Sequence, residues 1–152
     1  MRSYHVVNVS SWQPRQCGIY TFSHDLLDHL TGIELQEKRP VLSARVCAID
    51  NSQGKLNYRY PVDRRMIINS ADINSWQDKG IEIASFANQL SEPVIVTIQH
   101  EYGLDQTDGK QGYIRLVSTI KERAGDKTIL VLSAHTAVKN PNDELKTITS
   151  LA

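Results

Sequence analysis

Short apolar runs rich in β-branched residues alternate along this chain with longer stretches whose apolar residues recur at helical spacing. Each run is too short for a helix and is nearly continuous in apolar character, which is typical of strands buried on both faces. Strands that alternate with helices predict an α/β fold, a doubly wound Rossmann-like parallel sheet with helices on both faces. The expected strands are Tyr4–Val9, Leu42–Ile49, Arg65–Ile68, Val94–Ile98 and Thr128–Ser133.

Four stretches carry the helical pattern. Gly32 is expected to end the first and Gly125 the third, because glycine commonly follows the last turn of a helix. Gly80 lies inside the second and weakens that prediction. Asn140 and Pro141 suit the start of the fourth, as an N-cap and a first-turn proline. The expected helices are Ile19–Leu30, Ile73–Leu90, Tyr113–Ala124 and Asn140–Leu151, and Leu56–Tyr60, which ends at Pro61, is expected to be an edge excursion at most.

Doubly wound sheets commonly have the strand order 3-2-1-4-5, which places the first strand beside the fourth. The winding reverses between these two strands, and ligands bind there at the carboxyl ends. The loop Pro14–Ser23 follows the first strand and Gln99–Gly103 follows the fourth. His135 follows the fifth strand, next to them. The sequence therefore predicts one crevice flanked by three loops, within a single domain of residues 1–152.

Composition narrows the classes of function. The 152 residues suffice for one domain with its own core, and 17 basic side chains balance 17 acidic ones. A nucleic-acid-binding domain usually has a basic excess, so no nucleic-acid partner is expected. Cys17 and Cys47 do not form a disulfide framework and suit a reducing cytoplasm. No apolar run reaches the length of a membrane span, and the N-terminal run is too short for a secretory signal.

The first loop offers groups that could hold an anion. Gly18 is its only glycine, so the G-x-G-x-x-G pattern of dinucleotide-binding folds is absent and NAD or FAD is not expected. One glycine before a helix still allows an anionic or hydroxyl-rich ligand to approach the backbone N–H groups. Arg15 could bind a phosphate or carboxylate through its guanidinium. The alternatives are a glycine needed only for the turn and a solvated surface arginine.

His100, Glu101 and His135 are the titratable groups of the other two loops. His100 and Glu101 are adjacent at a strand end, so their side chains point in different directions and only one readily faces the crevice. Either could bind a sugar hydroxyl or act as a base, and His135 could equally be a loop residue that satisfies a carbonyl. Cys17 as a nucleophile with His100 as its base is a third reading. No HxH, HExxH or CxxC spacing is present, so no metal site is expected.

Three motifs together resemble a known family. PRQCGIYTFSHDL follows the first strand, QHEYG the fourth and SAHTAVKNP the fifth. In this order they resemble the N-terminal half of family-4-type glycosyltransferases of the GT-B fold, whose bacterial members often read close to P-R-x-C-G-I-A-T-F, Q-H-E-Y-G and T-x-H-T-V. The resemblance covers nearly the whole chain. Tyr20 and Ser133-Ala134 depart from the family pattern, and Tyr20 would narrow the crevice.

The resemblance implies an enzyme with two Rossmann-like domains that transfers a hexosyl group from a nucleotide-sugar to a sugar or glycan acceptor. Transfer would retain configuration and need no cofactor or essential metal, in the cytoplasm or peripherally on the inner membrane. This chain would be the acceptor-side domain, inactive without its C-terminal nucleotide-sugar domain. His135 would lie near the transferred sugar as the catalytic residue. The expected substrate-binding residues are Arg15, Gly18, Ile19, His100, Glu101, Tyr102 and Gly103.

The last helical pattern reaches Ala152 without a capping residue, which we read as a hint that the protein continues. A short C-terminal helix is the other reading of this end. The main alternative to the glycosyltransferase is a free-standing Rossmann-like binding module without catalysis.

Overall fold

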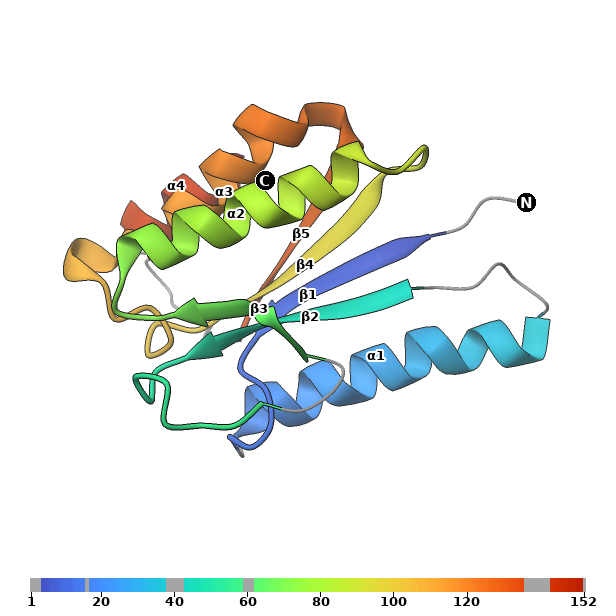
Figure 1. Ribbon diagram of the computed structural model, residues 1–152, viewed down its shortest axis with the longest axis horizontal. Coiled ribbons are helices and arrows are strands. Elements are labelled where there is room, and N and C mark those ends of the chain that lie inside the picture. Colours follow the sequence, from blue (N-terminus) through green and yellow to red (C-terminus); the bar gives the residue numbers. More distant parts are fainter. Residues whose placement is uncertain (1–3, 16, 38–42, 59–61, 136–142, 152) are drawn as a thin grey trace.

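The computed structural model describes residues 4–15, 17–37, 43–58, 62–135 and 143–151. Its strands form one parallel sheet in the order β3-β2-β1-β4-β5, which confirms the predicted α/β fold and strand order (Figure 1). β1 is central, paired with β2 on one side and β4 on the other. The strands are β1 His5–Ser10, β2 Ser43–Asp50, β3 Val62–Asn69, β4 Val94–His100 and β5 Thr128–Ala134.

The helices cover the two faces of the sheet unevenly. α1 lies alone on one side, which we call the α1 face, while α2, α3 and α4 lie on the other, the α2–α3 face (Figure 1). The helices are α1 Gly18–Glu37, α2 Ile73–Asn88, α3 Gly112–Ala124 and α4 Asp143–Leu151, with short 3₁₀ turns η1 Asp108–Lys110 and η2 Gly125–Lys127. Within the described chain, no helix is both long enough and apolar enough to cross a membrane.

The α2–α3 face holds the larger core. Alternate residues of the central strands, including Val7, Val9 and Ile98, pack there with the buried faces of α2 and α3. Gly80 of α2 lies against α3, since a Cβ at this position would come 2.9 Å from Cβ of Thr119. The glycine that weakens the helical pattern therefore lets the two helices approach closely.

The α1 face is covered mainly over β1 and β2. Val6, Leu27 and Val46 belong to the smaller buried cluster there. The residues of β5 on the α1 face are more exposed: Ile129 is 52% and Val131 is 45% exposed. Leu130 and Leu132, which alternate with them along β5, pack on the α2–α3 face.

Several element boundaries differ from the sequence-based expectation. Gly32 does not end α1, which continues to Glu37, because glycine inside a helix costs only about 1 kcal/mol relative to alanine and good helix formers follow it. β3 begins at Val62 rather than Arg65. β4 extends through Gln99 and His100, because both residues pair with β5.

The segment Leu56–Tyr60 is not a strand over its described part, Leu56–Tyr58. The expected N-cap and proline at 140 and 141 lie outside the described residues, as does Leu42.

Candidate functional site

Polar side chains of the two central strands meet on the α1 face near the carboxyl edge of the sheet. Asn8 is opposite Thr97 in the register of β1 and β4, and Gln99 is two residues further along β4. Asn8, Ser10 and Gln99 are essentially buried, and Thr97 is nearly so. Buried polar groups need hydrogen-bond partners, so each of these side chains is expected to have one.

These side chains form one continuous chain of hydrogen bonds. Asn8 Nδ2 donates to Ser10 Oγ at 2.8 Å, and Ser10 Oγ donates to the carbonyl of Ser11 at 3.0 Å. On its other side, Asn8 Oδ1 accepts from Thr97 Oγ1 at 2.8 Å and from Gln99 Nε2 at 3.2 Å. A connected network of this kind fixes the position of each member.

His135 is the outer end of this chain. Its Nε2 lies 2.8 Å from Gln99 Oε1, and its backbone N–H donates to the carbonyl of His100 at 3.1 Å. Both contacts are with β4, so this strand fixes the imidazole at the carboxyl edge of the sheet. We call the side chains of Ser10, Asn8, Thr97, Gln99 and His135 the Asn8 network.

Phe22 of α1 completes the surroundings of His135. The two rings meet edge to face with centroids 4.9 Å apart, and Phe22 remains 44% exposed. The start of α1 is therefore adjacent to the end of β5. The structure thus brings Phe22, near the start of α1, against His135 after β5.

The N-terminus of α1 begins with an exposed glycine. Gly18 is its first residue and is exposed, and a Cβ added there would have no neighbour within 4 Å. The first turn contains no acidic side chain to compete for the N–H groups. Ile19 differs, since its side chain is 5% exposed and belongs to the core, so it offers a ligand only its backbone. A helix N-terminus of this kind suits an anion.

The QHEYG segment divides between the two faces of the sheet. His100 is buried, and its ring meets those of Tyr102 and Tyr113 at centroid distances of 5.2 and 4.8 Å. Glu101 and Tyr102 are half-buried, and Gly103 is exposed. Gln99, the neighbour of His100 on the opposite face, contacts the His135 imidazole with its side chain.

Arg15 lies on the β2 side of the first loop. Burial raises the pKa of Tyr58, the Asp50 carboxylate raises it further, and the nearby Arg15 guanidinium partly offsets these effects. One terminal nitrogen of Arg15 is buried and makes no hydrogen bond within the described part of the chain. Asp50 itself accepts from the backbone of Ser52 and Gly54. Arg15 is thus associated with the end of β2.

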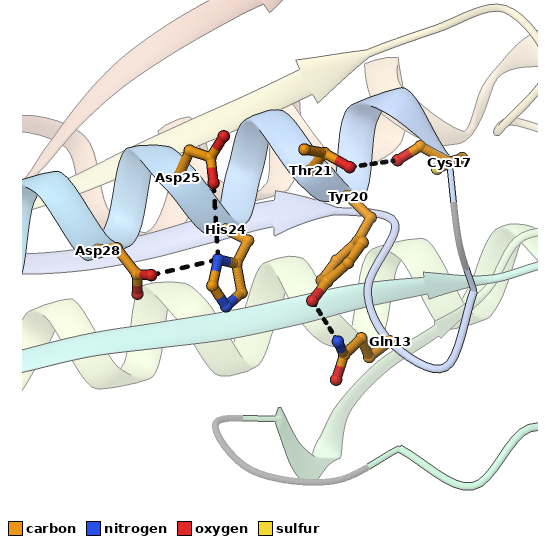
Figure 2. Close-up of polar contacts among 7 residues, drawn as sticks. All are labelled: Gln13, Cys17, Tyr20, Thr21, His24, Asp25 and Asp28. Carbon is orange, nitrogen blue, oxygen red and sulfur yellow. Dashed lines mark hydrogen bonds and ion pairs between the residues drawn. The ribbon is translucent and has the colours of Figure 1, made fainter.

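Tyr20 of α1 is partly buried against the smaller core cluster. It accepts a hydrogen bond from Gln13 Nε2 (Figure 2). Its ring also contacts those of Trp12 and His24. His24 Nδ1 lies 3.3 Å from Asp28 Oδ2 in the next turn (Figure 2). These contacts engage the Tyr20 side chain with Trp12 and His24.

Cys17 precedes α1 and is partly buried against the core. Its Sγ lies 3.0 Å from Ser11 Oγ. The contacts of Cys17 and of His100 described above are with other residues, so they lend no support to a thiol–imidazole pair.

Asn8 and Thr97 were not singled out by the sequence reasoning, and Gln99 only as part of a motif. The available signal was a polar residue flanked by apolar ones in each run: Asn8 in VVNV and Thr97 in VIVTI. Polar groups on a strand buried on both faces must find partners, and neighbouring strands are the nearest source.

Within the described ranges, no group of three or more His, Cys, Asp or Glu side chains could hold a metal ion. Comparison with family models, curated proteins and solved structures gives no match for this chain.

Proposed function

We propose that this chain is the acceptor-side domain of a glycosyltransferase of the GT-B type, which transfers a hexosyl group from a nucleotide-sugar. The observation that carries the proposal is the Asn8 network, because it joins β1, β4 and His135 at one edge of the sheet. The motifs PRQCGIYTFS, QHEYG and SAHTAVKNP begin at or just after the carboxyl ends of β1, β4 and β5, respectively.

The N-terminus of α1 would interact with the diphosphate of the donor. Its N–H groups and the positive end of the helix dipole favour negative charge, and Gly18 leaves room for close approach. In glycosyl transfer the departing diphosphate gains charge, and preorganised donors stabilise that charge as the bond breaks. The same groups that bind the donor would thereby lower the barrier.

His135 would orient the transferred sugar. Its imidazole is exposed at the edge of the sheet and fixed by Gln99, which suits a hydrogen bond to a sugar hydroxyl. Phe22 offers an apolar ring beside it, against which the C–H groups of a sugar could pack. Glu101 and Tyr102 are half-buried at the end of β4 and would lie on the acceptor side.

A second domain would supply most contacts to the nucleotide and close the cleft. One wall of a cleft does not exclude water, and glycosyl transfer competes with hydrolysis unless water is excluded. We therefore expect donor binding, without turnover, from the 152-residue chain.

NMR titration of the ¹⁵N-labelled chain with UDP-, GDP- and ADP-hexoses tests this proposal. The amides of Gly18, Ile19 and His135 should shift on addition of a nucleotide-hexose, and His135→Ala should weaken its binding. His29→Ala is the matched control, because His29 is exposed on α1. In an enzyme that joins this domain to its partner domain, His135→Ala should lower turnover more than it lowers the free energy of unfolding.

A nucleotide-sugar pulse that yields no glycosylated product, even with the two-domain enzyme, would exclude this function. Specific binding of an unrelated metabolite by the isolated chain would then favour the non-catalytic binding module.

A further inference from the structure

We propose that Gln99, held by Asn8 and Thr97, is a positioning residue that keeps His135 in the Nε2–H tautomer and leaves Nδ1 as the hydrogen-bond acceptor for a ligand hydroxyl. The tautomer follows from the Asn8 network alone. Only the identity of the ligand, a neutral sugar, rests on the function proposed above.

The direction of the hydrogen bonds is fixed at the inner end of the network. Ser10 Oγ lies 3.0 Å from the carbonyl oxygen of Ser11, which can only accept, so the Ser10 hydroxyl must donate its proton there. Ser10 Oγ then accepts from Asn8 at 2.8 Å. The amide nitrogen of Asn8 therefore faces Ser10, and its oxygen faces β4.

The order of donors and acceptors continues from Asn8 across β4 to His135. Asn8 Oδ1 accepts from the Thr97 hydroxyl and from Gln99 Nε2, at 2.8 and 3.2 Å. Gln99 consequently presents its oxygen to His135, 2.8 Å from Nε2. An amide oxygen has no proton to donate, so the imidazole must carry a proton on Nε2. Each donor in this sequence meets one acceptor, and reversing Gln99 would place two oxygens against each other.

The opposite tautomer would leave two acceptors facing each other at the end of the network. Gln99 is 1% exposed, so water has little access to its oxygen to replace the lost donor. The neutral imidazole thus has one preferred proton position, with a lone pair on Nδ1. In the described part of the chain Nδ1 makes no hydrogen bond, and the His135 side chain is exposed.

This arrangement distinguishes between ligand groups. A neutral imidazole that offers Nδ1 as acceptor pairs with a hydroxyl donor and has no proton there for a carboxylate or a phosphate. We therefore expect the sugar group beside His135 to be a neutral hydroxyl, as in a hexose, rather than the carboxylate of a uronic acid.

Long-range ¹H–¹⁵N spectra of the histidine side chains of this chain measure the tautomer directly. At a pH where His135 is neutral, its Nε2 should show the shift of a protonated nitrogen and its Nδ1 that of an unprotonated one. The signal is assigned by its loss in His135→Ala. Gln99→Leu should give a mixture of tautomers and weaken nucleotide-sugar binding by about tenfold. Gln89→Leu, at the exposed end of α2, is the matched control.

A protonated Nδ1 in the unmodified chain would overturn the proposal, as would an unchanged spectrum in Gln99→Leu. Ser10→Ala, which removes the hydroxyl that sets the direction of Asn8, serves if Gln99→Leu does not fold. The Asn8 and Gln99 amides are then free to reverse together, so both His135 tautomers should appear, and an unchanged spectrum would count against the network. The expected tautomer without binding of any nucleotide-sugar would support the positioning role and reject the glycosyltransferase instead.

Discussion

Gly112, the first residue of α3, lies directly against the indole ring of Trp76 in α2. A Cβ at this position would come 2.5 Å from Cε2 and 2.6 Å from Nε1 of that ring. Trp76 is fully buried, and its Nε1 donates to the carbonyl of Ser70 at 3.2 Å. Neither partner can therefore move aside without loss of packing or of this hydrogen bond.

Gly112→Ala should destabilise the fold without touching the Asn8 network. We expect the free energy of unfolding to fall by about 2 kcal/mol, as for an overpacked core, measured by urea denaturation. Gly103→Ala is the control, because a Cβ there meets nothing within 4 Å. Equal stability of the two variants would contradict this account.

Gly18→Val should separate ligand binding from folding. The added side chain has open space around it, so we expect the free energy of unfolding to change by less than about 1 kcal/mol. It would stand in front of the first N–H groups of α1, and the affinity for a nucleotide-sugar or nucleoside diphosphate should fall at least about tenfold. Calorimetric titration measures this, and unchanged affinity would place the diphosphate elsewhere.

Asp105→Asn should loosen the start of α3. The buried Asp105 carboxylate accepts from the backbone N–H groups of Thr107, Gly112 and Tyr113. Asparagine has one side-chain oxygen, and its NH2 group would face backbone N–H groups that are themselves donors. The free energy of unfolding should therefore fall by about 3 kcal/mol. Hydrogen exchange at the Gly112 and Tyr113 amides should accelerate with it. The exposed Asp108 supplies the control, and Asp108→Asn should leave both quantities unchanged.

The protein should lose stability in alkali through Cys47. Burial raises the pKa of this thiol from 9.0 to about 12. Above pH 9 the unfolded chain releases the thiol proton while the folded chain retains it, so the free energy of unfolding falls as pH rises toward 12. One such group contributes a slope of about 1.4 kcal/mol per pH unit.

Unfolding measured by urea between pH 8 and pH 11 should therefore show a smaller decline in Cys47→Ala than in the unmodified chain. Cys17→Ala is the control for loss of a thiol. If all three proteins declined in parallel, Cys47 would not be the cause.

The sequence was sufficient for the architecture because the signal for it is local. The run Val94–Ile98 and the helical spacing from Tyr113 to Ala124 each predict their element from neighbouring residues alone. Alternation of strands and helices, with the usual winding, then gave the correct strand order. Gly32 was misread because termination by glycine is a preference that a favourable following sequence overrides.

The site was predictable only in part. Sequence order indicated that His135 lies beside the loops after β1 and β4, and the contact with Phe22 agrees. The hydrogen bond between Gln99 and His135 could not be foreseen, because it depends on which face of the sheet the Gln99 side chain occupies and on where β4 ends. Extending the strand by Gln99 and His100 decides both.

The position of β1 has a consequence for how the domain is made on the ribosome. Its partners lie far along the chain, with His5 opposite Ser43 in β2 and opposite Val94 in β4. The strands β1 to β3 can associate early during synthesis, but Asn8 and Thr97, 89 residues apart, meet only after β4 has emerged. The edge that carries His135 is thus completed late, after a slow long-range pairing, and the Asn8 network forms only at that final step.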